Sequence, residues 1–379
     1  MMTNRPLSGI RVIEMAGIGP APFCAMMLAD MGAEIIRIDR HSDTFLGGGG
    51  TAIERGRRNL ILDLKQEEAK DIVKQLVATA DILIEGFRPG VMERLGLGPD
   101  DCFAINPALI YGRMTGWGQE GPLSKTAGHD INYIAVTGAL HAMGDATSPP
   151  NPPLHLVGDM GGGAMMLAYG IVCALLESQR SGQGQVVDAA ITSGASLNST
   201  MYYALIEQGL WNLNRGANLL DGAAPFYSCY RCQDGKFIAL GAIEPQFYRL
   251  LLELCGVEDE AIFQEQMNRD LWPEQKAAWA ALFQTRTQAQ WCELLEGTDA
   301  CFSPVLDFNE AVSYAHHQAR GSFQEINGNL YPAPEPILSR TPAQAGSISP
   351  AGHHSHEILA ELGFSEEAIQ ALREKQISN

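Results

Sequence analysis

Strand-like runs alternate with segments of helical periodicity through the first half of the chain, and this alternation constrains the fold more than any other feature. The strand-like runs are short and apolar, and they cover residues 10–15, 34–39, 59–64, 81–85, 109–114 and 185–190. The spacing of apolar residues predicts helices over 21–31, 69–80 and 161–179. Strands that alternate with helices form a parallel sheet with helices on both faces. We therefore expect an α/β fold, with one large domain over residues 1–195.

A different pattern begins at residue 226. Two strand-like runs within 226–242 flank Gln233-Asp234-Gly235, which is a hairpin turn signal, and helical patterns follow it. These features predict a smaller α+β domain over 226–329, joined to the large domain by a linker over 196–225. The chain closes with a proline-rich stretch and a last helix over about 356–376, and we expect residues 330–379 to complete the large domain.

The composition is that of a compact protein with an excess of acidic residues. Hydrophobic residues make up 46% of the 379 positions and charged residues 18%, which is typical of a globular chain without disordered tracts. The formal net charge of -18 argues against an extended surface that follows nucleic-acid phosphates. We therefore expect no nucleic-acid partner.

Two features favour a cytoplasmic protein that does not insert into a membrane. The 8 cysteines are scattered through the chain, and the opening residues lack the apolar stretch of an export signal, so we expect reduced thiols. The longest apolar run, residues 161–176, is shorter than the ~20 residues that span a bilayer and is rich in glycine. We interpret this run as a buried helix.

The turn after the first predicted strand resembles a dinucleotide-binding fingerprint without completing it. Gly17 and Gly19 follow the strand and Asp39 lies about 20 residues further on, but Pro22 occupies the position of the third glycine. A generic turn from strand to helix is the better interpretation. The glycine run at 47–50 precedes no helix and lacks the Lys-Ser/Thr of a phosphate-binding loop, so we interpret it as an ordinary loop.

Two short segments place a titratable side chain beside glycine at the edge of a predicted helix. They are Gly128-His129-Asp130-Ile131-Asn132-Tyr133 and Gly158-Asp159-Met160. Asp159 would lie at the N-terminus of the helix over 161–179, where free backbone N–H groups stabilise negative charge. The spacing leaves two interpretations open. Either His129 and Asp159 are a reactive acid and base, or His129 is a core histidine and Asp159 a helix cap.

Five stretches together resemble the α-methylacyl-CoA racemases of the family III CoA-transferase superfamily, over nearly the whole chain. They are Gly19 to Met26, Arg37-Ile38-Asp39-Arg40, Leu62-Asp63-Leu64-Lys65, Gly128 to Tyr133, and Gly241 to Tyr248. The resemblance implies an intertwined homodimer, each chain having a large Rossmann-like domain and a smaller α+β domain. It also implies that each active site is shared between the two subunits.

The resemblance implies roles for individual residues. His129 and Asp159 would be the two bases of a racemase, and Glu244 of the small domain would hydrogen-bond the histidine from the partner subunit. The positions that would hold coenzyme A are Arg40, Leu62, Asp63, Leu64, Lys65, Gly128, Asp130, Ile131, Asn132 and Tyr133. Methionines after Asp159 would offer an adaptable surface to acyl chains. One departure is His41, where relatives often have proline.

These residue types suit proton transfer at the α-carbon of a thioester. A base on one face removes the acidified α-proton and an acid on the other face returns one, which inverts the configuration. The expected reaction interconverts (R)- and (S)-2-methylacyl-CoA through an enolate, whose oxygen the amides after Gly158 would stabilise, and it needs no metal or redox cofactor. One alternative is a CoA-transferase in which Asp159 is a nucleophile that forms an aspartyl-CoA thioester. Another is a non-catalytic dimer that binds acyl-CoA.

Overall fold

The computed structural model describes residues 5–40 and 50–379 and divides the chain into two compact units. The first unit takes in Met1–Thr137, Leu154–Ser199 and Ala319–Asn379, and the second takes in Gly138–Pro153 and Thr200–Gln318. Most of the stretch predicted as a linker therefore belongs to the second unit, and it contains helix α8 (Thr200–Glu207). His41 and residues 47–49 of the glycine run lie outside the described residues.

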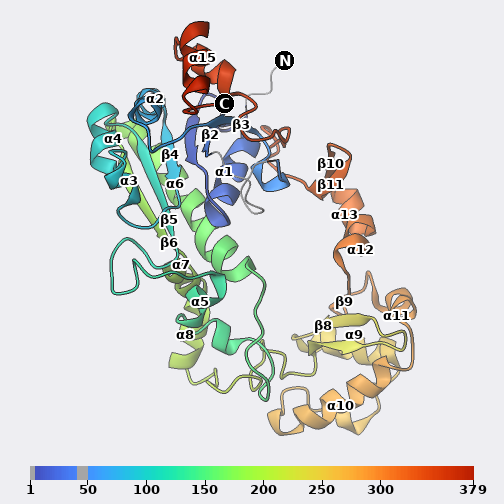
Figure 1. The fold of residues 1–379 in the computed structure, drawn as a ribbon. Coiled ribbons are helices and arrows are strands. Elements are labelled where there is room, and N and C mark those ends of the chain that lie inside the picture. The colour runs from blue at the N-terminus through green and yellow to red at the C-terminus, as the bar shows by residue number, and fades with distance from the viewer. Residues whose placement is uncertain (1–4, 41–49) are drawn as a thin grey trace. The chain divides into compact units, whose positions relative to one another are not determined.

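The first unit is built on a parallel sheet. Within the described residues this sheet has six strands in the order β3-β2-β1-β4-β5-β6 (Figure 1). The strands are β1 (Arg11–Met15), β2 (Glu34–Asp39), β3 (Arg57–Ile61), β4 (Ile82–Glu85), β5 (Ile110–Thr115) and β6 (Gln185–Ala190). All neighbouring pairs are parallel, which confirms the predicted α/β fold. The strand order reverses between β1 and β4, and open sheets of this kind bind ligands at that switch point.

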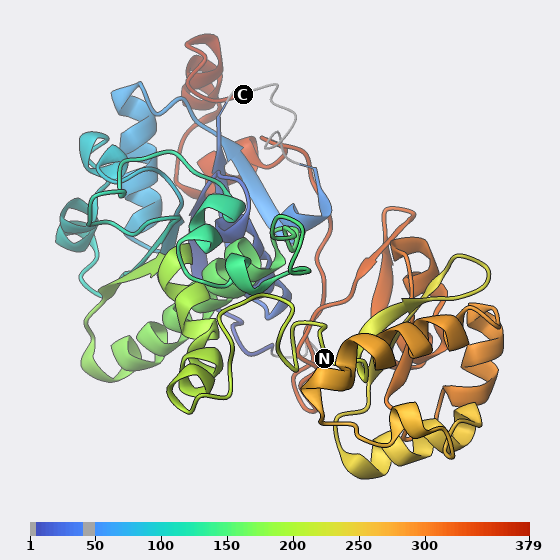
Figure 2. The same cartoon turned by 90° about the horizontal axis from the view of Figure 1, so that it is seen from below.

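Helices cover both faces of the sheet because successive strand residues enter two different apolar cores (Figure 2). Val12 faces the core that contains residues of α1 (Pro20–Asp30) and α6 (Met165–Ser181). Ile13 faces the core formed with α2 (Glu67–Val77), and here two C-terminal helices, α14 (Ser355–Glu361) and α15 (Glu366–Glu374), also contribute. The end of the chain thus packs against its first third.

The C-terminal helix differs from the prediction, because two helices replace the single one expected over 356–376. Gly363 between them has a φ of +89°, a left-handed conformation that suits glycine and ends α14. The side chain of Ser365 then accepts a hydrogen bond from the backbone N–H of Ala368 and caps α15. Sequence periodicity continues across this break, which is why it predicts one helix.

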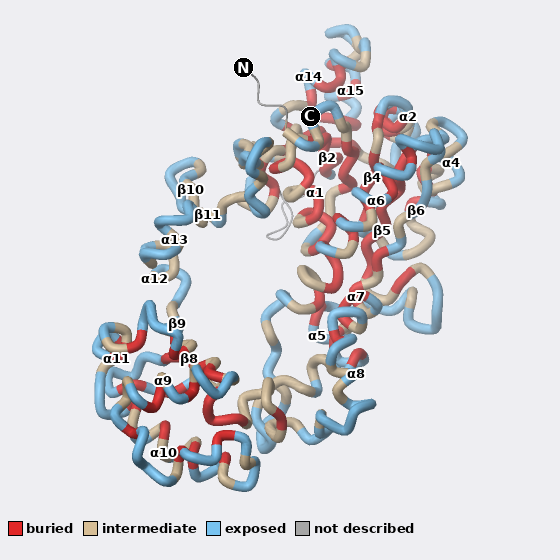
Figure 3. Tube along the Cα trace, turned by 180° about the vertical axis from the view of Figure 1, so that it is seen from behind, coloured by how far each residue is buried: buried red, intermediate tan, exposed pale blue. Residues whose placement is uncertain are grey.

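The helix expected over 161–179 begins earlier and is buried on one side only. A π-helical segment, η3 (Leu156–Ala164), leads directly into α6. Together they form a 26-residue helix, Leu156–Ser181, that is long and apolar enough to cross a bilayer, although core helices of water-soluble proteins have the same properties. Figure 3 shows that burial changes along this part of the chain. The exposed side of α6 carries an apolar stripe at helical spacing, formed by Met165, Tyr169, Val172 and Leu176. The expected helix is therefore confirmed but starts five residues earlier than predicted, and the expectation that it is buried holds for one side only.

The second unit contains an antiparallel sheet. Its strands within the described residues are β7 (Tyr227–Arg231), β8 (Phe237–Gly241) and β9 (Phe302–Val305), paired in that order. Three helices contribute to its aromatic core, namely α9 (Pro245–Cys255), α10 (Trp272–Phe283) and α11 (Gln288–Leu295). Gly235 has a φ of +81° in the turn between β7 and β8, which confirms the predicted hairpin.

Candidate active site

A cavity of about 530 Å³ lies at the carboxyl edge of the parallel sheet in the first unit. Its walls come from the loops after β1, β4 and β5, from α5 (Asp130–Ala135) and the loop before it, from η3, and from the start of α7 (Ile191–Asn198). The residues that line it include Gly19, Phe87, Arg88, Thr115, Trp117, His129, Asn132, Tyr133 and Asp159. The cavity therefore occupies the switch point at which the strand order reverses.

Both predicted acid–base residues line this cavity. His129 is the residue before α5, and its backbone N–H donates to Oδ1 of Asn132 at 3.0 Å, so its exposed ring is carried by a capped helix end. Asp159 lies within η3 and is half-buried. The wide turns of π-helical segments are frequent at functional sites. The structure thus brings together two residues that are 30 positions apart in the sequence.

The surroundings of Asp159 favour its protonated form. Burial raises the pKa of the Asp159 carboxyl most strongly, and the negative charge of Asp130 also raises it, to about 6 in all. His155 and His129 act in the opposite direction. A carboxyl with a pKa near 6 is present in both protonation states close to neutral pH. It is therefore able to accept a proton in one turnover and donate one in another.

The backbone N–H groups that follow Gly158 are already engaged within the protein. The N–H of Asp159 donates to Oδ1 of Asp130 at 2.7 Å, and the N–H of Met160 donates to the carbonyl of His155 at 3.1 Å. Asp159 lies in the first turn of η3, and its N–H binds a side chain from outside that helix. These two N–H groups thus have partners within the protein, and stabilisation of an enolate oxygen by amides after Gly158 stays a prediction.

Tyr133 forms an aromatic wall of the cavity because two glycines make room for its ring. A Cβ atom on Gly116 would lie 2.1 Å from Cε1 of Tyr133, and a Cβ atom on Gly128 would lie 2.7 Å from the same atom. The ring packs edge-on against Trp117 with 5.0 Å between the centroids, and its hydroxyl donates to the carbonyl of Gly128. The wall is thus a rigid surface of two aromatic rings.

Of the predicted coenzyme A positions in the 128–133 segment, three line the cavity and two do not. Gly128, Asn132 and Tyr133 line it. Asp130 is buried, with 7% of its surface exposed, and Ile131 is 43% exposed outside the cavity lining. Only Gly128, Asn132 and Tyr133 of this segment are therefore placed to touch a molecule in the cavity.

The other predicted coenzyme A positions lie beside one another at the carboxyl ends of β2 and β3. Arg40 follows β2 and is exposed, and the N–H of Leu62 after β3 donates to the carbonyl of Asp39 at 2.9 Å. Leu62 is buried in the core, Asp63 and Leu64 are half-buried, and Lys65 is exposed. Glu244 belongs to the second unit, where it precedes α9 with its side chain exposed.

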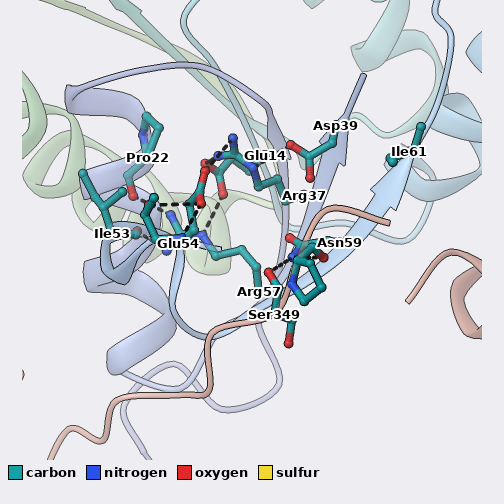
Figure 4. A network of polar contacts seen from close by, with 12 residues as sticks. Glu14, Pro22, Arg37, Asp39, Ile53, Glu54, Arg57, Asn59, Ile61 and Ser349 are labelled. Atoms are coloured by element: carbon teal, nitrogen blue, oxygen red, sulfur yellow. Dashed lines mark hydrogen bonds and ion pairs between the residues drawn. The ribbon is translucent and has the colours of Figure 1, made fainter. Parts of the chain in front are cut away.

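A network of buried charges joins β1, β2 and the first residue of β3 (Figure 4). Arg37 binds Oε1 of Glu14 at 2.8 Å and Oδ1 of Asp39 at 2.9 Å. The other carboxylate oxygen of Glu14 accepts from Nε of Arg57 at 2.9 Å, and Arg57 also donates to the carbonyl of Pro22 in α1. These ion pairs connect the strand that leads to Arg40 with the first turn of α1, which adjoins the cavity.

Sequence reasoning missed several cavity residues that directly follow strands. Phe87 and Arg88 come after β4, and Thr115 and Trp117 lie at the end of β5 and after it. Their position after a predicted strand was the available signal, because the carboxyl ends of parallel strands meet at one edge of the sheet. Arg88 brings a positive charge that acts on the phenol of Tyr133.

Comparison with known proteins identifies the family. The family model of CoA-transferase family III matches residues 7–355. The chain belongs to CoA-transferase family III. Within this family, the mouse protein named alpha-methylacyl-CoA racemase is 46% identical over 374 residues, which are 98% of this chain and 97% of that protein. The human protein of the same name is 44% identical over 98% of this chain and 97% of that protein.

A solved structure shows the fold of the family III chain. A CAIB/BAIF family protein from Brucella suis matches it with a TM-score of 0.79 and 25% identity. The match covers 95% of this chain and 100% of the Brucella chain. The predicted family III fold is therefore confirmed.

Proposed function

We propose that this chain is a racemase that interconverts (R)- and (S)-2-methylacyl-CoA thioesters. The observation that carries the proposal is a cavity at the switch point of the sheet, lined by both His129 and Asp159. The raised pKa of Asp159, about 6, supports a carboxyl that exchanges protons near neutral pH. The high identity to two proteins named alpha-methylacyl-CoA racemase supports the same reaction.

In the proposed mechanism the two side chains act from opposite faces of the substrate. In one direction His129 removes the α-proton of the thioester, and the protonated carboxyl of Asp159 returns a proton to the other face of the enolate. In the other direction the carboxylate of Asp159 is the base and the imidazolium of His129 is the acid. Each positioned acid or base contributes roughly 10²- to 10⁴-fold to the rate. Glu244 of the partner subunit holds the imidazole in the required tautomer.

The coenzyme A part of the substrate has its own proposed contacts. Arg40 and Lys65 would attract its phosphates, since both are exposed cations at one strand edge. The same part of the sheet edge would be formed by Leu62, Asp63 and Leu64. The pantetheine chain would then run along the 128–133 segment toward the cavity. The proposal requires no metal or redox cofactor, because the proton is moved by side chains alone.

We also propose that the chain forms a homodimer and that it works in the cytoplasm. The exposed apolar stripe on α6 supports a partner surface, since a run of large apolar side chains along one helix face is unusual on a monomer. A second copy of this chain is the proposed occupant. All 8 cysteines are free thiols, which is typical of a reducing compartment.

The decisive experiment follows α-hydrogen exchange. The protein is incubated in D₂O with one enantiomer of a 2-methylacyl-CoA, without an acceptor acid, and both α-deuterium content and configuration are measured. Deuteration with racemisation is expected for the wild type. His129→Ala and Asp159→Ala are each expected to lose roughly 10²-fold or more of the racemisation rate while retaining binding of the thioester.

The same assay separates the alternatives. An inert thioester that loses coenzyme A only after a second carboxylate is added would make Asp159 a nucleophile and the protein a CoA-transferase. The position of His129 in the same cavity favours racemisation, because covalent transfer through Asp159 requires no second base there. Tight acyl-CoA binding with neither exchange nor transfer would identify a binding protein.

A further inference from the structure

Asp130 lies beside the catalytic pair, yet its side chain does not line the cavity. It is the first residue of α5, directly after His129, and only 7% of its surface is exposed. Its Oδ1 atom accepts the backbone N–H of Asp159 at 2.7 Å. Its Oδ2 atom is buried and has no hydrogen-bond partner in the part of the chain that the structure describes. A buried carboxylate with one unpaired oxygen is costly, so its retention calls for a functional reason.

The backbone of η3 is shaped to receive this carboxylate. A Cβ atom on Gly158 would lie 2.3 Å from Oδ1 of Asp130 and 2.9 Å from its Cγ. No real side chain tolerates such contacts, so glycine at position 158 is what allows the carboxylate to reach the N–H of Asp159. The contact is therefore built jointly by α5 and η3.

The groups that surround Asp159 have charges of both signs. Asp130 in α5 contributes a negative charge, whereas His129 before α5 and His155 before η3 contribute positive charge when protonated. The phenol of Tyr133 in α5 also interacts with Asp159, and Arg88 in the loop after β4 acts on that phenol. From the loop after β1, Gly19 approaches Asp159: a Cβ atom there would lie 3.3 Å from Oδ2 of the carboxyl. Among these charged groups, Asp130 alone is negative.

We propose that Asp130 is a positioning residue whose buried carboxylate anchors the backbone of Asp159 and whose negative charge keeps Asp159 able to donate a proton. The inference rests on the racemase function proposed above, because only a racemase needs Asp159 as an acid in one direction. It assigns the side chain of Asp130 to the proton-transfer machinery rather than to coenzyme A. The protons balance in each direction: His129 takes the α-proton of the thioester, the Asp159 carboxyl gives its proton to the α-carbon of the enolate, and the reverse reaction returns both groups to their starting states.

Asp130→Asn separates the two parts of this role. The amide oxygen of asparagine can still accept the N–H of Asp159, so the anchor is kept while the charge is removed. Without that charge, the protonated form of Asp159 is less favoured. We expect the acidic limb of the kcat/KM profile, measured for racemisation, to move to lower pH by roughly one unit. Because the two proton-transfer groups form a coupled pair, the two directions of the reaction share one pH profile. The acidic limb should therefore move by the same amount with either enantiomer as the substrate.

Two variants serve as controls. Asp71→Asn also removes one carboxylate, but from the exposed face of α2, where Asp71 pairs with Lys74. It should leave the pH profile unchanged. Gly158→Ala would push the Asp130 carboxylate away from Asp159 and should move the acidic limb in the same direction as Asp130→Asn. Thermal unfolding monitored by circular dichroism confirms that each variant is folded.

A second readout does not depend on activity. Carbon-13 labelled aspartate allows the Asp159 carboxyl to be titrated by NMR, with Asp159→Asn identifying its signal. We expect Asp130→Asn to lower the titration midpoint of Asp159, and an unchanged midpoint in a folded variant would overturn the proposal. A loss of kcat with an unmoved pH profile would also overturn it, since a purely structural role predicts that result. If the wild type exchanges no α-proton, the racemase function fails while the titration still reports on the Asp130–Asp159 contact.

Discussion

Two carboxyl groups at the carboxyl edge of the sheet carry pKa values well above the ordinary range. Burial is the main cause for both Asp159 and Asp39, and it raises each pKa to about 6. For Asp39, the paired Arg37 lowers the pKa, while Glu14 and Glu54 raise it. A carboxyl that is disfavoured as an anion reduces folding stability at neutral pH. These two carboxyl groups therefore lower the free energy of unfolding at neutral pH relative to carboxyl groups with ordinary pKa values.

The first prediction concerns Asp159→Asn and the pH dependence of stability. The pKa of Asp159 is about 6 in the folded protein, whereas an ordinary aspartate, as in the unfolded chain, has a pKa of 3.8. Between these values the folded state binds more protons than the unfolded state, so the free energy of unfolding falls as the pH rises. We expect the variant to unfold at a higher temperature than the wild type at about pH 8, with the difference vanishing near about pH 4. An equal difference at both pH values would contradict the raised pKa.

A second prediction concerns Arg37, which is fully buried. Its guanidinium pairs with Glu14, Asp39 and Glu54 at distances of 2.8 to 3.1 Å. Arg37→Met leaves these buried carboxylates without their main partner, which costs roughly 3–5 kcal/mol. The free energy of unfolding in urea measures this loss. The matched control is Arg11→Met, which removes a half-exposed pair with Glu34 and should cost about 1 kcal/mol or less.

At the scale of elements, the position of Asp159 depends on how closely η3 packs against α7. A Cβ atom on Gly194 of α7 would lie 1.8 Å from the carbonyl oxygen of Gly162 in η3, and a Cβ atom on Gly162 would lie 2.7 Å from the N atom of Ala195. The two backbones are therefore in direct contact. Glycine at positions 162 and 194 lets the two backbones approach this closely. The close packing in turn holds η3, and with it Asp159, at the cavity wall.

A third prediction tests this contact with Gly194→Ala. The added methyl group must push α7 away from η3, so we expect lower thermal stability and a fall in kcat for racemisation of roughly 10-fold or more. Gly241→Ala in β8 is a suitable control, since its added Cβ atom would meet no atom closer than 3.9 Å. Wild-type kcat in Gly194→Ala would show that the close packing is not needed for catalysis.

At the scale of the whole molecule, the apolar stripe on α6 is the main exposed feature that the isolated chain does not explain. Met165, Tyr169, Val172 and Leu176 are 44% to 71% exposed. Their opposite side of α6 enters the core of the first unit through Leu167, Ile171 and Leu175. A helix that is apolar on both sides is stable in water when a second surface covers the exposed one.

The fourth prediction follows from the proposed homodimer. Tyr169→Glu places a charge in the middle of the stripe and should convert the dimer to a monomer, as measured by sedimentation velocity. Because Glu244 is proposed to come from the partner, the racemisation rate should fall when the dimer is lost. Glu177→Gln on the same helix alters a charge at an exposed site outside the stripe and should leave the dimer intact. A fully active Tyr169→Glu monomer would remove the partner's Glu244 from the mechanism.

The sequence by itself determined the elements and the family. The parallel sheet, the hairpin at 233–235 and the apolar faces of α2 and α9 follow from local periodicity and turn residues, which act over a few positions. Five short stretches, one of which contains His129, indicated the family, and that resemblance in turn indicated His129 and Asp159 as the two candidate bases.

Only the tertiary structure decided the contacts between distant segments. Strand order, and therefore the cavity at the switch point, depends on which strands pair across the chain. Asp159 lies in the first turn of a π-helical segment that packs against α5 and α7, and its N–H finds a partner in the side chain of Asp130 in α5. The anchoring contact from Asp130 and the break at Gly363 were likewise invisible to periodicity. Burial and pairing over long distances decide such features, and no local pattern encodes them.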